Sequence, residues 1–308
     1  MKVSIIGMGR VGSALAFAVV LKELADQLVL VNKKRDVAVG DALDLTHAHL
    51  FLEHNVEIRA GGIGDTAASD VVAICASAPW KDNFKSRADA AGPNTRLFEQ
   101  IIPQIANASP HAKLLIVTNP VDVLTWHAIR LSGFSPRRVM GTGTLVDSAR
   151  FRELLSESVR IHPTDLRAYV LGEHGPTQFA ALSCAEAGGE RLEDKPERRR
   201  LFEAAREAGL DVFRAKGYTN YAIAMAAAYV IDSIKNDACH TMPLSVRIDG
   251  YCGVRDVCLS VPVVVGKDGV DRWLKPELSP AEAAAFRCSA EAVRGLIEAT
   301  LRPGEGKK

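Results

Sequence analysis

Three residues stand out because together they suit proton transfer beside a bound acid. His174 lies in a glycine-flanked turn, GEHG at residues 172–175, after a short predicted strand. Asp147 and Arg150 lie one turn apart on a predicted helix, so their side chains point the same way. A carboxylate fixes the tautomer of a histidine, and an arginine can hold a carboxylate through two hydrogen bonds. This set suits carbonyl reduction, which needs a proton donor, a polarising cation and an anchor for the reacting molecule.

A glycine-rich turn, GMGRVG at residues 7–12, joins the first predicted strand to the first predicted helix. Glycines in this context permit a tight turn and let the backbone approach a pyrophosphate. The helix N-terminus adds unpaired N–H groups and the positive end of the helix dipole. The pattern predicts a dinucleotide site formed by Gly7, Gly9, Arg10, Val11 and Gly12.

The second predicted strand ends without the expected acidic residue. In dinucleotide-binding folds an acid about twenty residues after the glycines holds the ribose 2′-hydroxyl of NAD. Here Asn32 occupies that position, and Lys33, Lys34 and Arg35 follow it. Losing the carboxylate and gaining three cations favours a 2′-phosphate. We therefore expect NAD(P) as cofactor, with a lean towards NADP; the alternative is that Asn32 bonds the hydroxyl of NAD and that the basic run is solvated.

The elements that carry these residues alternate between strands and helices. Val- and Ile-rich runs without polar alternation predict parallel strands covered on both faces. They lie at residues 3–6, 28–31, 56–60, 71–75 and 114–118, and helical patterns lie at 11–24, 37–50 and 95–107. Repeated strand–helix units predict an α/β fold, a Rossmann doubly wound parallel sheet.

After about residue 140 the pattern becomes a mixture of helices and strands. Helices are predicted from residues 146, 195 and 221, and strands near 167–184, 243–249 and 257–265. A last helix begins at Ser279-Pro280, with serine as its N-cap. This mixture predicts a C-terminal α+β domain, so we expect a dinucleotide-binding domain at 1–140 and a catalytic, substrate-binding domain at 141–308.

Composition narrows the class of partner. The 308 residues carry a formal net charge of +1, which gives no electrostatic reason to expect nucleic acid or a membrane surface as partner. The six cysteines are scattered and form no C-x-x-C pair, which is typical of reduced thiols in a cytoplasmic protein. The N-terminus resembles no signal peptide, and the longest apolar stretch, residues 222–231, is too short to cross a bilayer.

Several motifs, taken together, resemble the L-lactate/malate dehydrogenase superfamily over nearly the whole chain. They are GMGRVG, GDALDL at 40–45, TNPVDVLT at 118–125, GTGTLVDSARFR at 141–152, GEHG at 172–175 and KGYTNYAIA at 216–224. The resemblance implies hydride transfer between a nicotinamide cofactor and an L-2-hydroxy acid. It implies His174 as acid/base with Asp147 as its partner, and Arg150 as the anchor of the substrate carboxylate.

The resemblance assigns further roles around that centre. Arg87, at the end of a loop at about 78–88, would polarise the carbonyl when the loop closes and excludes water. Asn119 would contact both substrate and nicotinamide, and Asn119-Pro120 resembles a cis peptide of the family. A homodimer or homotetramer is implied as well.

Substrate choice depends on the same loop. Malate dehydrogenases of the family carry an extra arginine there and lactate dehydrogenases a glutamine, whereas this chain has Asp82 or Asn83. An aspartate would repel a second carboxylate, so oxaloacetate is disfavoured, although Lys81 or Lys85 keeps malate dehydrogenase as the alternative. Thr219 resembles the lactate-type pocket, and GTGT resembles L-2-hydroxyisocaproate dehydrogenase. With Trp80 and Phe84 as pocket walls, we expect a 2-oxo acid with an apolar or aromatic side chain.

Other interpretations are weaker. Asp44, His47, His49 and His54 resemble metal ligands, but His47 and His49 diverge by about 200° around a helix, so we expect no metal. Arg152 and Arg167 match positions that hold an anionic effector in some bacterial lactate dehydrogenases; two solvated arginines are the simpler interpretation. From other classes, a catalytically silent nucleotide-sensing module and an NAD-dependent glycoside hydrolase remain as rivals.

Overall fold

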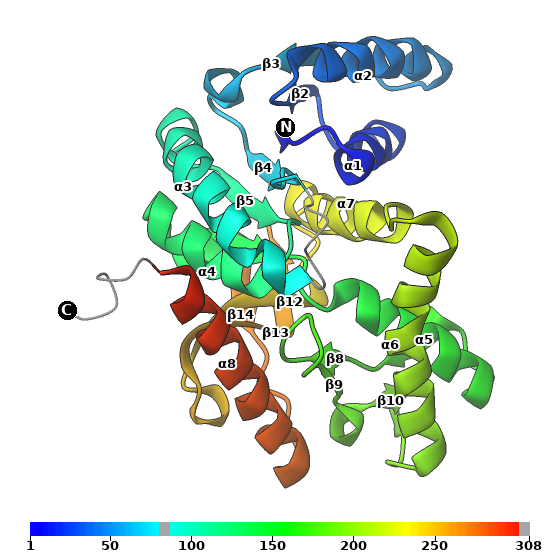
Figure 1. Ribbon diagram of the computed structural model, residues 1–308. Coiled ribbons are helices and arrows are strands. Elements are labelled where there is room, and N and C mark those ends of the chain that lie inside the picture. The colour runs from blue at the N-terminus through cyan, green and yellow to red at the C-terminus, as the bar shows by residue number, and fades with distance from the viewer. Residues whose placement is uncertain (80–86, 302–308) are drawn as a thin grey trace.

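A single nine-stranded sheet runs through the molecule (Figure 1). The computed structural model describes residues 1–79 and 87–301, and for residues 87 and 88 it describes the backbone alone. The strand order is β14-β13-β12-β6-β5-β4-β1-β2-β3. One sheet therefore connects the two halves of the chain.

The first half contributes six parallel strands in the order β3-β2-β1-β4-β5-β6. Their bounds are β1 Lys2–Ile6, β2 Gln27–Val31, β3 Glu57–Gly61, β4 Val71–Ile74, β5 Lys113–Ile116 and β6 Val139–Gly141. The strand order reverses at β1, because the chain first moves outward to β2 and β3 and then crosses to β4. In doubly wound folds the ligand binds at this switch point, at the carboxyl ends of the strands. The predicted Rossmann fold is confirmed.

Helices cover both faces of this sheet, as its largely buried central strands require. They are α1 Arg10–Leu21, α2 Arg35–Ala48, α3 Ala91–Ala108 and α4 Val121–Ser132. Figure 1 shows α3 and α4 side by side with the last helix, α8 (Pro280–Thr300), while α1 lies along α7 (Tyr221–Lys235).

Helix α4 was not predicted from the sequence. Its residues 121–129 are all buried, so the helix has no polar face to mark a helical period. It ends at Gly133, which adopts the left-handed conformation (φ 66°) that favours glycine.

The second half extends the same sheet with antiparallel strands. These are β12 (His240–Asp249), β13 (Arg255–Gly266) and β14 (Gly269–Trp273). Ser245 of β12 pairs with Gly141 of β6 and so joins the two halves. The strands predicted near 243–249 and 257–265 are present, but their joining to the first sheet was not foreseen. The domain boundary at 140/141 stays a prediction.

The remaining elements form a smaller lobe beside the sheet. Helices α5 (Leu145–Val159) and α6 (Pro196–Lys216) pack against a separate apolar cluster that includes Phe151, Leu155 and Phe202. In place of the strand pair predicted near 167–184, the structure has short strands of two residues each: β7 Leu166–Arg167, β8 Val170–Leu171 and β9 Phe179–Ala180. Two more, β10 Glu186–Ala187 and β11 Glu190–Arg191, follow beyond that range. Helix α8 begins as predicted: Ser279 accepts a hydrogen bond from the Glu282 N–H in a capping box.

Across the described residues, no helix is both long and apolar enough to span a bilayer.

Candidate functional site

The glycine-rich turn lies where the strand order reverses, between β1 and α1. Gly7 has φ +100°, and a Cβ there would lie 2.4 Å from the backbone N of Ala76, two residues beyond the end of β4. A Cβ on Gly12 would lie 2.0 Å from the carbonyl oxygen of Gly7. Only glycine fits these two positions, because backbone atoms occupy the space of a side chain.

Gly9 differs from the other two glycines, because an added Cβ would meet no described atom within 4 Å. It is the N-cap of α1, and none of the described side chains caps that helix end. Open space and uncapped N–H groups at a helix N-terminus fit the pyrophosphate of a dinucleotide. Arg10, the first residue of α1, stacks its guanidinium 3.9 Å from the ring centroid of Tyr218.

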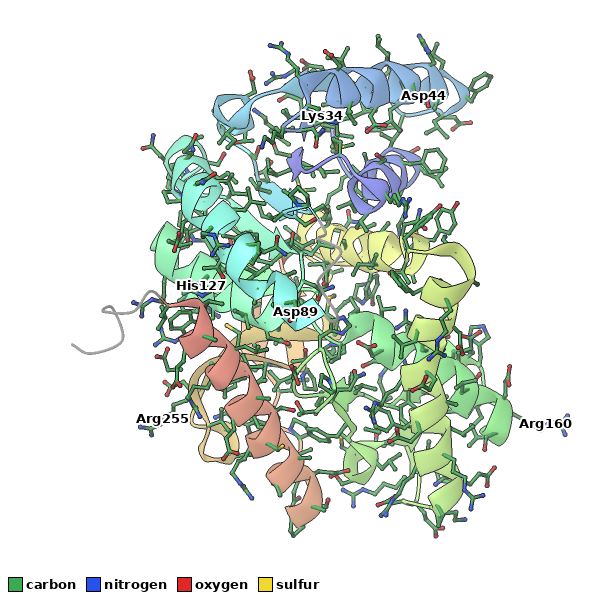
Figure 2. The ribbon with its side chains drawn as sticks, viewed as in Figure 1. Lys34, Asp44, Asp89, His127, Arg160 and Arg255 are labelled. Atoms are coloured by element: carbon green, nitrogen blue, oxygen red, sulfur yellow. The ribbon has the colours of Figure 1, made fainter. Side chains whose placement is uncertain are left out.

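The basic run lies at the start of α2, beside the glycine-rich turn. Asn32 follows β2; its Oδ1 accepts the Met8 N–H (3.2 Å) and its Nδ2 donates to the Lys34 carbonyl (3.1 Å). Figure 2 shows Lys34 near one end of α2 and Asp44 towards the other. Lys33 and Arg35 are exposed. The structure therefore brings Asn32 to the glycine-rich turn and leaves cations beside it.

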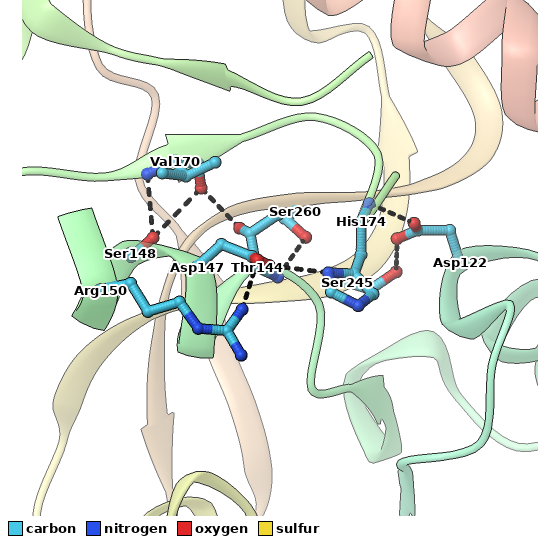
Figure 3. A network of polar contacts seen from close by, with 9 residues as sticks. All are labelled: Asp122, Thr144, Asp147, Ser148, Arg150, Val170, His174, Ser245 and Ser260. Atoms are coloured by element: carbon cyan, nitrogen blue, oxygen red, sulfur yellow. Dashed lines mark hydrogen bonds and ion pairs between the residues drawn. The ribbon is translucent and has the colours of Figure 1, made fainter. Parts of the chain in front are cut away.

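The predicted histidine, aspartate and arginine meet in the structure (Figure 3). His174 Nδ1 lies 2.7 Å from Asp147 Oδ2, and Arg150 donates from Nη1 to Asp147 Oδ1 at 3.2 Å. The Asp147 side chain is only 7% exposed, whereas those of His174 and Arg150 are 17% and 21% exposed. A carboxylate at Nδ1 holds that proton and leaves Nε2 as the atom that exchanges a proton. The arrangement places a histidine with a fixed ring orientation beside a cation, which suits proton transfer next to a bound acid.

Space around Arg150 comes from helix α6. A Cβ on Gly209 would lie 2.8 Å from Arg150 Nη1 and 3.1 Å from Cζ. Because any larger residue would displace the guanidinium, Gly209 sets how closely α6 approaches it. This contact was not found from the sequence, because one glycine in a charged helix carries no distinguishing pattern.

Asp122, in the first turn of α4, holds the histidine loop from the other side. Its Oδ2 accepts the backbone N–H of His174 at 2.7 Å, and its Oδ1 accepts the Ser245 hydroxyl at 2.6 Å. Burial raises the pKa of Asp122 to about 6, although these two hydrogen bonds oppose the shift. We did not predict this residue. The available signal was a carboxylate in the apolar run PVDVLTW.

A second set of buried polar contacts ties the histidine loop to α5 (Figure 3). The Val170 N–H of β8 donates to Ser148 Oγ at 2.9 Å, and Thr144 Oγ1 donates to the Val170 carbonyl. The Thr144 N–H in turn donates to Ser260 Oγ of β13 at 3.0 Å. The strand before His174 is therefore fixed to the helix that carries Asp147.

The other predicted substrate residues are placed less completely. Asn119 ends the segment after β5, its bond to Pro120 is cis, and its carbonyl accepts a 2.7 Å hydrogen bond from Asn94 Nδ2. Thr219 is half-buried in the turn between α6 and α7. Arg87 begins a short 3-10 helix before α3, and its side chain is not described. Trp80, Asp82 and Asn83 lie outside the described residues, as do Lys81, Phe84 and Lys85.

Two further sequence features have simpler surroundings. His49 Nδ1 contacts the Thr46 carbonyl and His54 Nε2 the Ala25 carbonyl, and residues 1–79 and 87–301 contain no cluster of metal-ligating groups. Arg152 is largely buried, near Tyr169 and Tyr229, and burial together with the charge of Arg167 lowers its pKa. Arg167 is exposed, as the simpler interpretation expects, whereas Arg152 is not fully solvated; the effector site stays the untested alternative.

Comparisons with known proteins cover almost the entire chain. Residues 1–141 match the lactate/malate dehydrogenase NAD binding domain, and residues 144–302 match the lactate/malate dehydrogenase alpha/beta C-terminal domain. An L-lactate dehydrogenase of Gloeobacter violaceus is 36% identical, with 96% of this chain and 92% of that protein covered. One from Thermoanaerobacter sp. is 37% identical, with 96% and 98% covered.

A solved structure agrees with these sequence relatives. It is a lactate dehydrogenase enzyme from a Medee basin deep-sea metagenome library, with a TM-score of 0.93 and 29% identity. The alignment covers 97% of this chain and 98% of that one.

Proposed function

The chain belongs to the lactate/malate dehydrogenase family and is an NAD-dependent 2-hydroxy acid dehydrogenase, and we propose that it interconverts L-2-hydroxy monocarboxylic acids and their 2-oxo acids. The observation that carries this proposal is the contact of Asp147 with both His174 and Arg150. Reduction converts a 2-oxo acid, a reduced nicotinamide and one proton into a 2-hydroxy acid and the oxidised nicotinamide.

His174 is the proposed acid/base. Its Nε2 delivers a proton to the carbonyl oxygen as negative charge develops there, and it accepts the proton in the reverse direction. Asp147 stabilises the protonated ring, because its carboxylate is only 7% exposed and lies 2.7 Å from Nδ1. Arg87 is proposed to polarise the same carbonyl.

Arg150 is the proposed anchor of the substrate carboxylate. A guanidinium can hold a carboxylate with two parallel hydrogen bonds, which also fixes the direction of the carbonyl. Asp147 orients Arg150 at 3.2 Å and Gly209 leaves it room. Asn119 and Thr219 are proposed to complete the substrate pocket.

The cofactor is proposed to lie across the glycine-rich turn, with its pyrophosphate at Gly9 and at the N-terminal residues of α1, Arg10 to Gly12. The open space at Gly9 and the uncapped helix end support this placement. When bound, the nicotinamide supplies or takes up the hydride. The protein's part is to hold the acid so that its carbon faces that ring.

Beyond NAD, we propose that the enzyme accepts NADP and leans towards it. The support is the missing acid at Asn32 and the exposed Lys33 and Arg35 beside it. Asn32→Asp would add a negative charge against a 2′-phosphate, so the ratio of kcat/KM for NADPH to that for NADH should fall. Lys275→Gln, a charge change outside this region, is the control. A ratio unchanged by Asn32→Asp would show that the basic run is solvated surface.

The proposed substrates carry an apolar or aromatic side chain, an expectation that rests on the loop sequence. The test follows the absorbance of reduced nicotinamide with NADH or NADPH and each of pyruvate, 2-oxoisocaproate, phenylpyruvate and oxaloacetate. Fastest turnover of the bulkier acids supports the proposal, and fastest turnover of pyruvate assigns a lactate dehydrogenase. Preferred oxaloacetate would contradict the monocarboxylic assignment. Cofactor binding without any turnover would favour a sensing module.

We also propose that two or four copies associate, in the cytoplasm. Helices α1, α2, α6 and α7 expose several large apolar side chains, among them Phe17, Leu43, Phe213 and Met225. Apolar surface of this kind marks contact sites, and unpaired cysteines fit a reducing compartment. Sedimentation velocity of the wild type and of Leu43→Glu tests the association. A monomeric wild type would contradict it.

A further inference from the structure

We propose that Asp122 is a positioning residue, which fixes the position of the His174 backbone by accepting a hydrogen bond from its N–H. This inference rests on the proposed role of His174 as acid/base. Asp122 comes from α4 and lies on the opposite side of the histidine from Asp147 (Figure 3). The two carboxylates act on different parts of His174: Asp147 orients the imidazole ring, and Asp122 holds the backbone of the loop.

The geometry supports this division. The His174 N–H lies 2.7 Å from Asp122 Oδ2, within the range of a charge-assisted bond. Asp122 itself is only 3% exposed, so water does not compete for either oxygen. The second oxygen accepts from Ser245, a fully buried residue in the middle of β12. His174 is thereby linked through Asp122 to the buried central sheet.

The position of Asp122 along the chain adds a second link. It lies three residues after Asn119, the proposed contact of substrate and nicotinamide, and two after the cis-bonded Pro120. The same first turn of α4 therefore connects the proton donor with the substrate-contacting segment. A shift of this turn would change the distance between the proton and the carbonyl oxygen.

Holding an ionised carboxylate in the interior is unfavourable, and burial raises the pKa of Asp122 to about 6. The groups facing it are His174 and Glu173 from the turn and Cys258 from β13. No cation among the described residues forms an ion pair with Asp122 to offset this burial. Within the described part of the chain, Asp122 is therefore held by two hydrogen bonds and by no ion pair, and the bond to the His174 N–H gives this buried acid a positioning role in addition to its contribution to stability.

The experiment compares Asp122→Ala with Asp122→Asn. The alanine variant leaves the His174 N–H without an acceptor. The asparagine variant keeps an oxygen for that N–H, while its amide can donate to Ser245, whose hydroxyl can accept. Ser233→Ala is the matched control: it removes a buried hydroxyl that donates to the Val265 carbonyl (2.7 Å) on β13, outside the site.

The first readout needs no activity. Protein labelled with ¹⁵N at histidine amides gives one signal for each of the eight histidines, and exchange with deuterium reports how firmly each N–H is bonded. Asp122→Ala should accelerate exchange at His174 by roughly 10- to 100-fold, and Ser233→Ala should not. Unchanged exchange in Asp122→Ala would overturn the inference, even if the proposed function failed.

The second readout is kinetic and uses a 2-oxo acid that the wild type reduces. In Asp122→Ala we expect kcat to fall about 100-fold while KM and the Kd of reduced nicotinamide change little. The primary deuterium isotope effect on kcat should rise, because chemistry becomes rate-limiting. Asp122→Asn should recover most of the loss, and Ser233→Ala should lower thermal stability alone. Accelerated exchange with wild-type kcat, or an asparagine variant as slow as alanine, would overturn the positioning role.

Discussion

Replacing Asp147 by asparagine should separate the proton donor from its support while barely changing the shape of the site. The carboxylate accepts from His174 Nδ1 at 2.7 Å and from Arg150 Nη1 at 3.2 Å. An asparagine has one acceptor and one donor end, so it can serve only one of the two neighbours. Whichever way the amide turns, a donor faces His174 or Arg150.

The size of the effect follows from distance and burial. Opposite charges about 4 Å apart interact by about 4 kcal/mol at an effective dielectric constant of 20. The 7% exposure of Asp147 justifies that dielectric constant rather than the value for water. The dipole of the amide retains part of this interaction, so we expect a loss of about 2–3 kcal/mol from the transition state. That corresponds to a decrease of about 30- to 150-fold in kcat/KM for 2-oxo acid reduction.

The assay is steady-state reduction of a 2-oxo acid, with the Kd of reduced nicotinamide measured separately by fluorescence. Asp232→Asn is the control, because Asp232 forms a partly buried ion pair with Lys22 (3.2 Å) between α7 and α1. Cofactor affinity should be unchanged in both variants. A kcat/KM for Asp147→Asn within threefold of wild type would refute the role assigned to the contact with His174, as would a loss confined to cofactor binding.

Three further predictions concern stability and cofactor binding. Between pH 3.8, the ordinary pKa of an aspartate, and about pH 6, Asp122 is protonated in the folded protein but ionised in the unfolded chain. The free energy of unfolding should therefore fall as the pH rises through this window. Urea titrations of Asp122→Asn should lack this decrease. His127, on α4 beside α8, has the opposite effect, because burial lowers its pKa from 6.5 to about 4 (Figure 2). Its contribution to the free energy of unfolding is therefore lost as the pH falls from 6.5 to about 4. A His127→Gln variant whose free energy of unfolding varies with pH as in the wild type would contradict this. Gly12→Ala should lower the melting temperature, because its Cβ would lie 2.0 Å from a backbone oxygen. Gly9→Ala should melt like the wild type but bind NADH weakly. Equal NADH affinity in Gly9→Ala and the wild type would contradict the placement of the pyrophosphate at this turn.

Much of the fold could be predicted because local patterns carried it. Strands β1, β2 and β4 are almost wholly buried and rich in Val, Ile and Leu, and the glycine-rich turn marked where the first helix begins. Helix α4 was not predicted, because it is buried on every side and its sequence lacks the periodic polar residues that mark a surface helix. The joining of β12 to β6 escaped because Ser245 and Gly141 lie 104 residues apart in sequence, and no local pattern encodes that pairing.

The site was predictable to the same degree. Asp147 and Arg150 share a helical face, and the glycines around His174 marked its turn, whereas the pairing of His174 with Asp147 was implied by the resemblance to the family. The structure brings them within hydrogen-bond distance, which spacing could not establish. Asp122 and Gly209 act through contacts between segments far apart in sequence, so composition and periodicity gave them no weight.

The order of the strands explains why these distant segments meet. β5 and β6 are parallel neighbours, so the segments that follow them emerge at the same edge of the sheet: one begins α4 with Asp122, and the other begins α5 with Asp147. His174 comes from neither strand, and it reaches this edge because β8 is bonded to Ser148 of α5. Two helices therefore hold its loop: α5 through the contact of Ser148 with Val170, and α4 through the contact of Asp122 with the His174 N–H. Asp122 and Ser148 therefore hold the loop of the proposed proton donor, His174, and their replacement should lower kcat more than it raises KM.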